Sequence, residues 1–228
     1  MLIGITGKSC SGKDFLSAIF QNQGCREINL DAIGHMALEH NCWEIVQAFP
    51  ELADRSGPKN VQKTIDRKKL GDLVFRNPAA LHKLEGILHP WMRRLVLQEL
   101  ESHGGTIHIV SGERTKHMDY HPGHRNFILN AAILEKLGLL PLCDLVLWVE
   151  SPLWLRVWRA RQREQISLLG FLRRNRAQRG LKVPSQFQAT VFRIKNAKMR
   201  REDGLVNVIQ QLRQIPRLRC MFESGQSS

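Results

Sequence analysis

The segment that constrains this chain most is GKSCSGKD, Gly7 to Asp14, close to the N-terminus. It follows the apolar run LIGI of residues 2–5, which predicts a strand, and it precedes FLSAIF, which predicts a helix. Strand, glycine-flanked loop and helix form the context of a phosphate-binding loop, and the spacing G-x-x-x-x-G-K is complete. Glycines let consecutive backbone N–H groups turn inward around a phosphate, while the helix N-terminus adds its positive dipole end. The sequence therefore predicts a nucleotide-binding loop.

Within this loop we expect Lys13 to reach the β- and γ-phosphates of the nucleotide. Asp14 occupies the Ser/Thr position whose hydroxyl usually ligates Mg²⁺. A carboxylate can also ligate Mg²⁺, but it places negative charge near the phosphates unless the metal neutralises it. Lys8, an extra cation in the loop, would offset that charge, so we expect nucleotide binding with altered metal geometry, and lost activity is the alternative. The residues expected at the nucleotide are Gly7, Lys8, Ser9, Cys10, Ser11, Gly12, Lys13, Asp14 and Phe15.

The distribution of charge indicates one local anion site. The 228 residues carry a formal charge of +13, yet residues 1–150 hold 17 basic and 17 acidic residues. Residues 151–228 hold 17 basic and only 4 acidic residues, so the whole excess lies in the C-terminal third. This pattern disfavours a uniformly basic nucleic-acid binder and favours a basic region that handles anions.

Other classes of protein are excluded by composition. The apolar fraction of 43% is too high for general disorder, and no run approaches the roughly 20 apolar residues of a membrane span. The N-terminus has no charged segment followed by a long apolar one, so we expect no signal peptide. The five cysteines are odd in number and widely spaced, which fits neither a disulfide framework nor a zinc site and favours a cytoplasmic location.

Asp31 is the first candidate for a catalytic residue. Residues 28–30 predict a second short strand, and Asp31 falls at its C-terminal end, where ligands of parallel sheets bind. A carboxylate there can accept the proton of an attacking hydroxyl. Asp31 also precedes a helical stretch, so a role as helix N-cap is equally open at this point.

The segment TIDRKKLGDLVFRNPAALHKLEGILHPWMRRLV, residues 64–96, resembles the dephospho-coenzyme A kinase family. That family carries a D-R-x-x-L-x-x-x-V/I-F stretch, then Asn-Pro or a similar pair, then L-x-x-I-L-H-P. The matching residues are Asp66, Arg67, Leu70, Val74, Phe75, Asn77, Pro78, Leu84, Ile87, Leu88, His89 and Pro90.

The resemblance extends along nearly the whole chain. The family often has Asp-Ala-Asp after its second strand, and here Asn29 replaces the first Asp while Asp31 keeps the second. The lid motif R-x-x-x-R-[D/N] is present as Arg159 and Arg163, with Glu164 in the last position. FRIKN resembles the final strand of the family and ends in Asn196, which is expected near ATP. The proline expected before Ile133 is absent.

The resemblance implies an α/β fold of the P-loop NTPase type, similar to nucleoside monophosphate kinases, with three layers around a parallel sheet, a helical substrate-binding insertion and a helical lid. It implies transfer of phosphate from ATP, with Mg²⁺, to the ribose 3′-hydroxyl of dephospho-coenzyme A, the last step of coenzyme A biosynthesis. The expected segments are a core of residues 1–31, 103–150 and 190–222, an acceptor subdomain of 32–102, and a basic lid of 151–189.

The same resemblance assigns roles to individual residues. Asp31 is expected to orient or deprotonate the acceptor hydroxyl. Lys13 is expected to hold the phosphates of ATP. Arg159 and Arg163 lie four residues apart on one helix face and are expected to clamp the transferred group. His89 and Arg67 are expected on the acceptor side.

Three parts of the prediction stay open. Residues 111–126 contain His117, His121 and His124, but a polar surface loop is favoured over a metal site, and residues 223–228 are expected to be disordered. Which of the apolar runs TIHIV and FILNAAIL supplies the core strand is undecided, as is the oligomeric state. The rival functions are a P-loop kinase with another small acceptor, a catalytically weak relative, and a basic nucleic-acid-binding module.

Overall fold

The computed structural model describes residues 1–52, 66–102, 105–109, 116–120, 126–164, 175, 191–198 and 201–223. The chain divides into two compact units, one formed by Met1–Ile28 with Glu101–Ser228 and the other by Asn29–Leu100. Asp31 therefore belongs to the second unit, whereas the sequence grouped residues 1–31 with the core.

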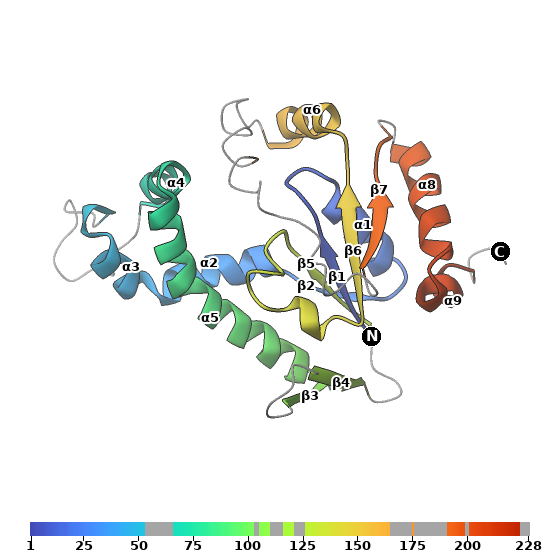
Figure 1. Ribbon diagram of the computed structural model, residues 1–228, viewed down its shortest axis with the longest axis horizontal. Helices are drawn as coiled ribbons and strands as arrows, with labels where there is room; N and C mark the ends of the chain where they lie inside the picture. The colour runs from blue at the N-terminus through green and yellow to red at the C-terminus, as the bar shows by residue number, and fades with distance from the viewer. Residues whose placement is uncertain are drawn as a thin grey trace. The chain divides into compact units, whose positions relative to one another are not determined.

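The first unit is built on a five-stranded parallel sheet in the order β2-β5-β1-β6-β7 (Figure 1). Its strands are β1 (Leu2–Thr6), β2 (Arg26–Ile28), β5 (Phe127–Asn130), β6 (Leu145–Glu150) and β7 (Val191–Lys195). Strands β1 and β6 are buried along almost their whole length, which explains their continuous apolar sequences. The parallel sheet confirms the predicted α/β class.

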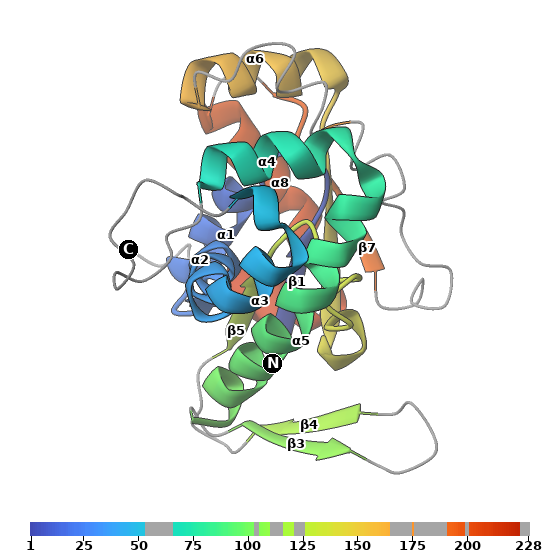
Figure 2. The ribbon, with the colours of Figure 1, turned by 90° about the vertical axis from the view of Figure 1, so that its left-hand side faces the viewer.

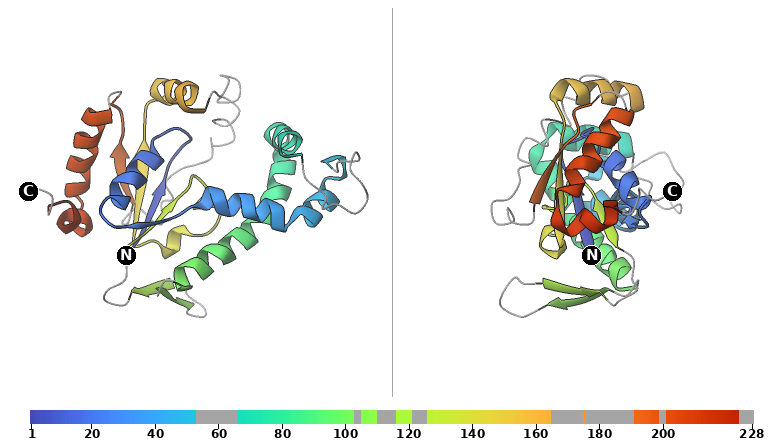
Figure 3. Two further views of the ribbon diagram at one scale, coloured as in Figure 1. Left: turned by 180° about the vertical axis from the view of Figure 1, so that it is seen from behind. Right: turned by 90° about the vertical axis from the view of Figure 1, so that its right-hand side faces the viewer.

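One face of this sheet is covered by α1 (Lys13–Gln21), α8 (Arg201–Arg213) and α9 (Arg219–Glu223), which pack into one apolar core with it. Figure 3 shows α8 running beside β7, with α9 at its end. The rings of Phe20 and Phe222 meet edge to face at 5.3 Å and join α1 to α9. The sheet contributes Ile3, Ile5, Ile128, Leu145, Leu147, Val149 and Ile194.

The opposite face is covered by the segment after β5, which includes the 3₁₀ helix η2 (Leu140–Leu142). Here Gly4 of β1 allows a close approach, because a Cβ at this position would lie 2.9 Å from Cys143 Sγ and 3.4 Å from Leu134 Cδ1. Burial raises the pKa of the Cys143 thiol, which is therefore a neutral core group.

The two apolar runs TIHIV and FILNAAIL, between which the sequence left the core strand undecided, form strands of different sheets. Strand β5 joins the parallel sheet between β1 and β2, so FILN supplies the core strand. The earlier run forms β3 (Gly105–Ile109), which pairs antiparallel with β4 (Lys116–Tyr120) in a separate two-stranded sheet (Figure 2). Part of the predicted loop 111–126 is thus strand β4, and its expected loop structure is wrong for residues 116–120.

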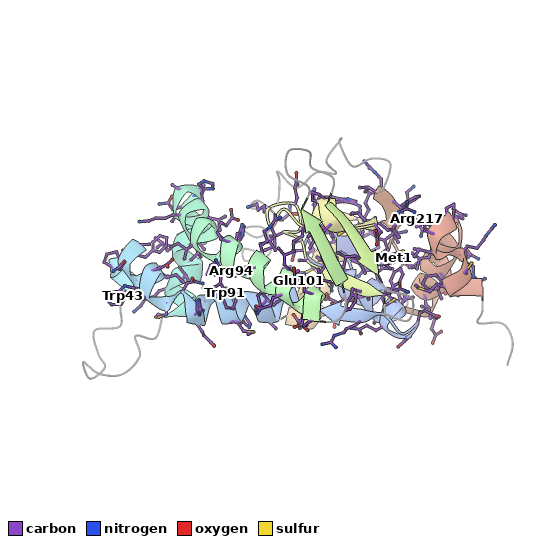
Figure 4. The ribbon with its side chains drawn as sticks, turned by 90° about the horizontal axis from the view of Figure 1, so that it is seen from below. Met1, Trp43, Trp91, Arg94, Glu101 and Arg217 are labelled. Atoms are coloured by element: carbon purple, nitrogen blue, oxygen red, sulfur yellow. The ribbon has the colours of Figure 1, made fainter. Side chains whose placement is uncertain are left out.

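The amino ends of β1 and β6 are tied to the C-terminal segment. Asp144 accepts the Leu2 N–H through Oδ2 at 2.7 Å. Its carbonyl accepts from Arg217 Nη1 at 2.6 Å, and Arg217 belongs to the 3₁₀ helix η4 (Pro216–Leu218). Figure 4 labels Met1 and Arg217 at this end of the first unit.

The second unit is helical in the ranges described. It contains α2 (Leu30–His40), α3 (Cys42–Ala48), η1 (Pro50–Leu52), α4 (Arg67–Arg76) and α5 (Pro78–Ser102), whose last two residues belong to the first unit. Apolar residues at helical spacing form its core, namely Ile45, Phe49, Leu52, Leu70, Val74, Ala80 and Leu84.

Two residues of the family motif in this unit act as helix caps. Asp66 Oδ1 accepts the Lys69 N–H at 3.0 Å at the start of α4. Asn77 Oδ1 accepts the N–H groups of Ala79 and Ala80 at 3.0 and 3.3 Å at the start of α5. Caps of this kind stabilise a helix by about 1 kcal/mol.

The remaining helix, α6 (Leu153–Glu164), follows β6 directly in the first unit. In the ranges described above, no helix combines the length and the apolarity that crossing a membrane requires.

Candidate active site

The loop between β1 and α1 requires glycine at both ends. Gly7 has φ +145°, and a Cβ there would lie 2.5 Å from the Val149 carbonyl oxygen. Gly12 has φ +98°, and its Cβ would overlap Asn196 Nδ2. Both glycines of the predicted motif are therefore demanded by backbone conformation and by close packing.

Lys13 folds back over this loop. Its Nζ donates to the Lys8 carbonyl at 3.3 Å, and the same carbonyl accepts the Ser11 N–H at 3.2 Å. These two bonds close a tight turn and hold the ammonium group beside the loop amides. Cys10, inside this turn, has φ 59° and is the one non-glycine residue with positive φ in the described ranges.

Arg159 of α6 and Asn196 after β7 meet at the end of the loop. Arg159 Nη1 donates to the Ser11 carbonyl at 3.0 Å and to Ser151 Oγ at 3.1 Å. Its Nη2 donates to Asn196 Oδ1 at 3.1 Å, while Asn196 Nδ2 donates to the same Ser11 carbonyl at 3.1 Å. The structure thus brings together two predicted ATP-binding residues, Ser11 and Asn196, and the predicted catalytic residue Arg159.

Arg156, one helical turn earlier on α6, makes a second contact of this kind. Its Nε donates to the Ser9 carbonyl at 2.7 Å, and its Nη2 donates to Asn175 Oδ1 at 3.0 Å. The residue is only 4% exposed, and burial lowers the pKa of its guanidinium while Cys10 opposes that shift. An arginine stays charged at physiological pH, so this is a buried cation against the loop backbone.

Ser11 carries an unsatisfied group in the described structure. It is 1% exposed, and among the described residues its Oγ has no hydrogen-bond partner. A buried hydroxyl without a partner is unfavourable unless a ligand or water satisfies it. Together with the glycine-bounded backbone, it marks this loop as a place where a ligand completes the structure.

Asp14 lies in the first turn of α1 and is bound to the end of β5. Asn130 Nδ2 donates to Asp14 Oδ1 at 3.0 Å and to Glu27 Oε1 at 2.9 Å. Gln21 Nε2 donates to the other oxygen of Glu27. Asn130 is the last residue of β5 and is paired in register with Ile5 of β1. Its bond to Asp14 therefore lies at the carboxyl end of the sheet, beside the loop.

A pocket of about 770 Å³ opens beside the loop within the first unit. Its cationic lining residues are Lys8, Arg156, Arg193 and Lys195, against one carboxylate, Glu150, which pairs with Arg193 at 3.0 Å. The local excess of positive charge agrees with the basic C-terminal third.

In the second unit, Asn29 takes the capping role that the sequence left open for Asp31. Asn29 is the N-cap of α2, and its Oδ1 accepts the Ala32 N–H at 2.9 Å. Strand β2 spans Arg26–Ile28, so the strand predicted over residues 28–30 lies two residues too far along the chain. Asp31 lies in the first turn of α2 with an exposed side chain, which leaves its carboxylate accessible.

The other predicted residues are placed less completely. His89 is half-buried in the middle of α5, which continues through Pro90, so a helix end at His89 is excluded. Phe15, in the first turn of α1, packs against the apolar core of the first unit. The side chains of Arg67 in α4 and Arg163 in α6 lie outside the described residues, as does most of the predicted lid.

The sequence model of the dephospho-CoA kinase family matches residues 1–198. The chain belongs to this family. A dephospho-CoA kinase of Treponema pallidum is 32% identical over 186 residues, which cover 81% of each chain. Members of the family phosphorylate dephospho-CoA with ATP in the final step of coenzyme A biosynthesis, so the predicted kinase class is confirmed.

Solved structures agree with this assignment. The crystal structure of a Thermus thermophilus protein has a TM-score of 0.66 and 26% identity, and the match covers 92% of this chain and 94% of that one. A dephospho-CoA kinase from Campylobacter jejuni has a TM-score of 0.56 at 24% identity, with 93% and 97% of the two chains covered, and supports the fold.

Two residues that contact the candidate site, Arg156 and Asn130, were missed by the sequence analysis. Arg156 precedes Arg159 by three positions and Arg163 by seven, so helical spacing already put all three on one face. Asn130 ends the apolar run FIL, which is the signal of a polar group at a strand end. Its partnership with Asp14 could not be predicted while two apolar runs competed for the core strand.

Proposed function

We propose that this chain transfers the γ-phosphoryl group of ATP to the ribose 3′-hydroxyl of dephospho-CoA, which gives coenzyme A and ADP. The observation that carries the proposal is the glycine-bounded loop with Lys13 held over it, in a chain whose family phosphorylates dephospho-CoA. Because this loop binds phosphates through amides and a cation, its chemistry suits a nucleoside triphosphate.

On the ATP side, Lys13 and the loop amides bind the β- and γ-phosphates. Arg159 already contacts the loop through the Ser11 carbonyl, and from there it stabilises charge on the transferred group together with Arg163. Asn196 and Phe15 complete the ATP-binding set. The buried Ser11 hydroxyl, which has no partner among the described residues, supports a polar ligand at this place.

On the acceptor side, Asp31 orients the 3′-hydroxyl and accepts its proton as the new P–O bond forms and the bond to the ADP oxygen breaks. Its exposed carboxylate near the start of α2 is consistent with that role. His89 and Arg67 bind the acceptor nucleotide. We also propose a cytoplasmic location, which the five free thiols support.

The donor set beside the loop fits Mg²⁺. Asp14 and Asn130 present a carboxylate and an amide, and oxygen atoms of these groups are the ligands that Mg²⁺ prefers. In P-loop kinases the metal neutralises charge on the β- and γ-oxygens. The hydroxyl that P-loop enzymes usually carry at the start of this helix is the carboxylate of Asp14 here, and the Asn130 amide bound to it would be the neighbouring ligand group.

A substrate panel tests the proposal. ADP release is followed by a coupled assay with dephospho-CoA, nucleoside monophosphates and shikimate, each with Mg²⁺ or Mn²⁺. We expect turnover with dephospho-CoA alone. Transfer to a nucleoside monophosphate or to shikimate, without transfer to dephospho-CoA, would overturn the proposal, and so would the absence of turnover with either metal.

A further inference from the structure

Two carbonyl groups of the phosphate-binding loop, those of Ser9 and Ser11, are held by donors from outside the loop. In a planar trans peptide the C=O and the following N–H point in opposite directions. A donor that fixes a carbonyl therefore also fixes the direction of the next amide. Arg156 Nε holds the Ser9 carbonyl, and Arg159 and Asn196 hold the Ser11 carbonyl.

The Ser9–Cys10 peptide is the critical one, because it precedes a strained residue. Cys10 has φ 59°, a left-handed conformation that disfavours a non-glycine residue by about 1–2 kcal/mol. Rotation of the Ser9–Cys10 peptide would relieve this conformation. The same rotation would exchange the directions of the Ser9 carbonyl and the Cys10 N–H, and would thus present an oxygen to the nucleotide phosphates.

Arg156 opposes that rotation. Its 2.7 Å bond to the Ser9 carbonyl comes from a buried side chain, which Asn175 holds from the other side through Nη2. The exposed Arg161, on the same helix, offers a matched control.

We propose that Arg156 is a positioning residue for nucleotide binding, which keeps Cys10 left-handed and thereby directs the Cys10 N–H toward the phosphates. The inference rests on the proposed use of this loop for ATP. Arg156 acts through the loop backbone and touches no reacting atom.

Three variants separate the hydrogen bond from the charge. Arg156→Met keeps an unbranched side chain as far as the Nε position, where it puts a methyl group, and removes the rest of the guanidinium. Arg156→Gln places an amide nitrogen at the same number of bonds from Cβ as Nε, so it keeps the donor and removes the charge. Arg156→Lys keeps the charge and puts a methylene group at that position. Arg161→Met is the control.

The affinity for ADP, measured by isothermal titration calorimetry, is the readout. We expect it to fall about tenfold in Arg156→Met and about fivefold in Arg156→Lys, and to change less than about threefold in Arg156→Gln and Arg161→Met. Full affinity in Arg156→Lys, or a loss in Arg156→Gln equal to that in Arg156→Met, would show that charge is what matters and would overturn the proposal. The affinity of Arg156→Lys tests the hydrogen bond against the charge even if Arg156→Met does not fold.

The Cys10→Gly background supplies the second test, because glycine adopts the left-handed conformation without strain. Here we expect Arg156→Lys and Arg156→Met to lose less than about twofold in ADP affinity. If the Arg156 variants lose as much ADP affinity in this background as in the parent protein, the proposal is overturned. Such a result would show that Arg156 acts by a route other than the conformation of Cys10. Failure to phosphorylate dephospho-CoA would overturn the proposed function and leave these affinities measurable, so the two failures are distinguishable.

Discussion

Substitution of Gly12 by alanine tests how tightly the nucleotide loop is packed. The new Cβ would sit in a backbone with φ +98° and would overlap Asn196 Nδ2. Asn196 would have to turn away from the Ser11 carbonyl and from Arg159, and so lose two hydrogen bonds of 3.1 Å. Strain of about 1 kcal/mol, a neutral bond of about 1 kcal/mol and a charge-assisted bond of about 2 kcal/mol give about 4 kcal/mol.

Two other glycines separate these contributions. Gly24 has φ +83° with nothing within 4 Å of its added Cβ, so Gly24→Ala measures the backbone strain alone. Gly86 lies inside α5, also with nothing within 4 Å, so Gly86→Ala should stabilise the protein by about 0.5–1 kcal/mol.

Differential scanning calorimetry provides the comparison. For a chain of this length about 1 kcal/mol shifts Tm by about 2–4 °C, so we expect Gly12→Ala to lower Tm by about 12 °C and Gly24→Ala by about 3 °C. ADP should stabilise the Gly24 and Gly86 variants like the parent protein and should stabilise the Gly12 variant little. Equal losses of Tm in Gly12→Ala and Gly24→Ala would refute the packing of Gly12 against Asn196.

Three further predictions concern the reacting groups, the metal and pH. Asp31→Asn should lower kcat by about 10²–10⁴-fold and leave ADP affinity unchanged in calorimetry, and an unchanged kcat would remove Asp31 from the mechanism. Asp14→Ser should weaken Mn²⁺ binding to the ADP complex about tenfold, as measured by electron paramagnetic resonance. The double variant Asp14→Ser with Asn130→Asp should restore this affinity to within about threefold of the parent protein. A double variant that binds Mn²⁺ as weakly as the single one would show that Asn130 does not face the metal. Burial raises the pKa of the Cys25 thiol from 9.0 to about 11. The unfolded thiol thus loses its proton first, so the free energy of unfolding should fall between pH 9 and 11, and Cys25→Ala should flatten that fall in urea titrations; an unaltered slope would contradict the assignment.

The parts of the fold that depend on local sequence were predictable. Residues 2–21 specify strand, loop and helix through their own composition, because only glycine satisfies the conformations at Gly7 and Gly12. The long helix α5 follows from the three- and four-residue spacing of its apolar residues. The helix continues through Pro90, which lies in its interior. By contrast, entry into the parallel sheet depends on pairing between strands far apart in sequence, so the choice between the runs that form β3 and β5 stayed open and β4 was predicted as part of a loop.

The candidate site shows the same division. The loop itself was predicted, whereas the buried Arg156 was not, because its importance comes from a contact with Ser9 across 147 positions. The N-cap at the start of α2 went to Asn29, because β2 ends two residues earlier than expected.

Part of the positive charge in the C-terminal third also has a structural explanation. Arg156 and Arg159 hold loop carbonyls, Arg193 pairs with Glu150, and Arg217 ties η4 to Asp144. These contacts are within the protein, which argues against nucleic-acid binding as the reason for the charge.

The most direct test of the central claim is the structure of the product. The protein is incubated with ATP and dephospho-CoA, and the product is examined by mass spectrometry and ³¹P nuclear magnetic resonance. We predict coenzyme A with a 3′-phosphate, no product from a 3′-deoxy analogue of dephospho-CoA, and no product from Lys13→Met. A phosphate at any other position, or product from the 3′-deoxy analogue, would contradict the proposed reaction.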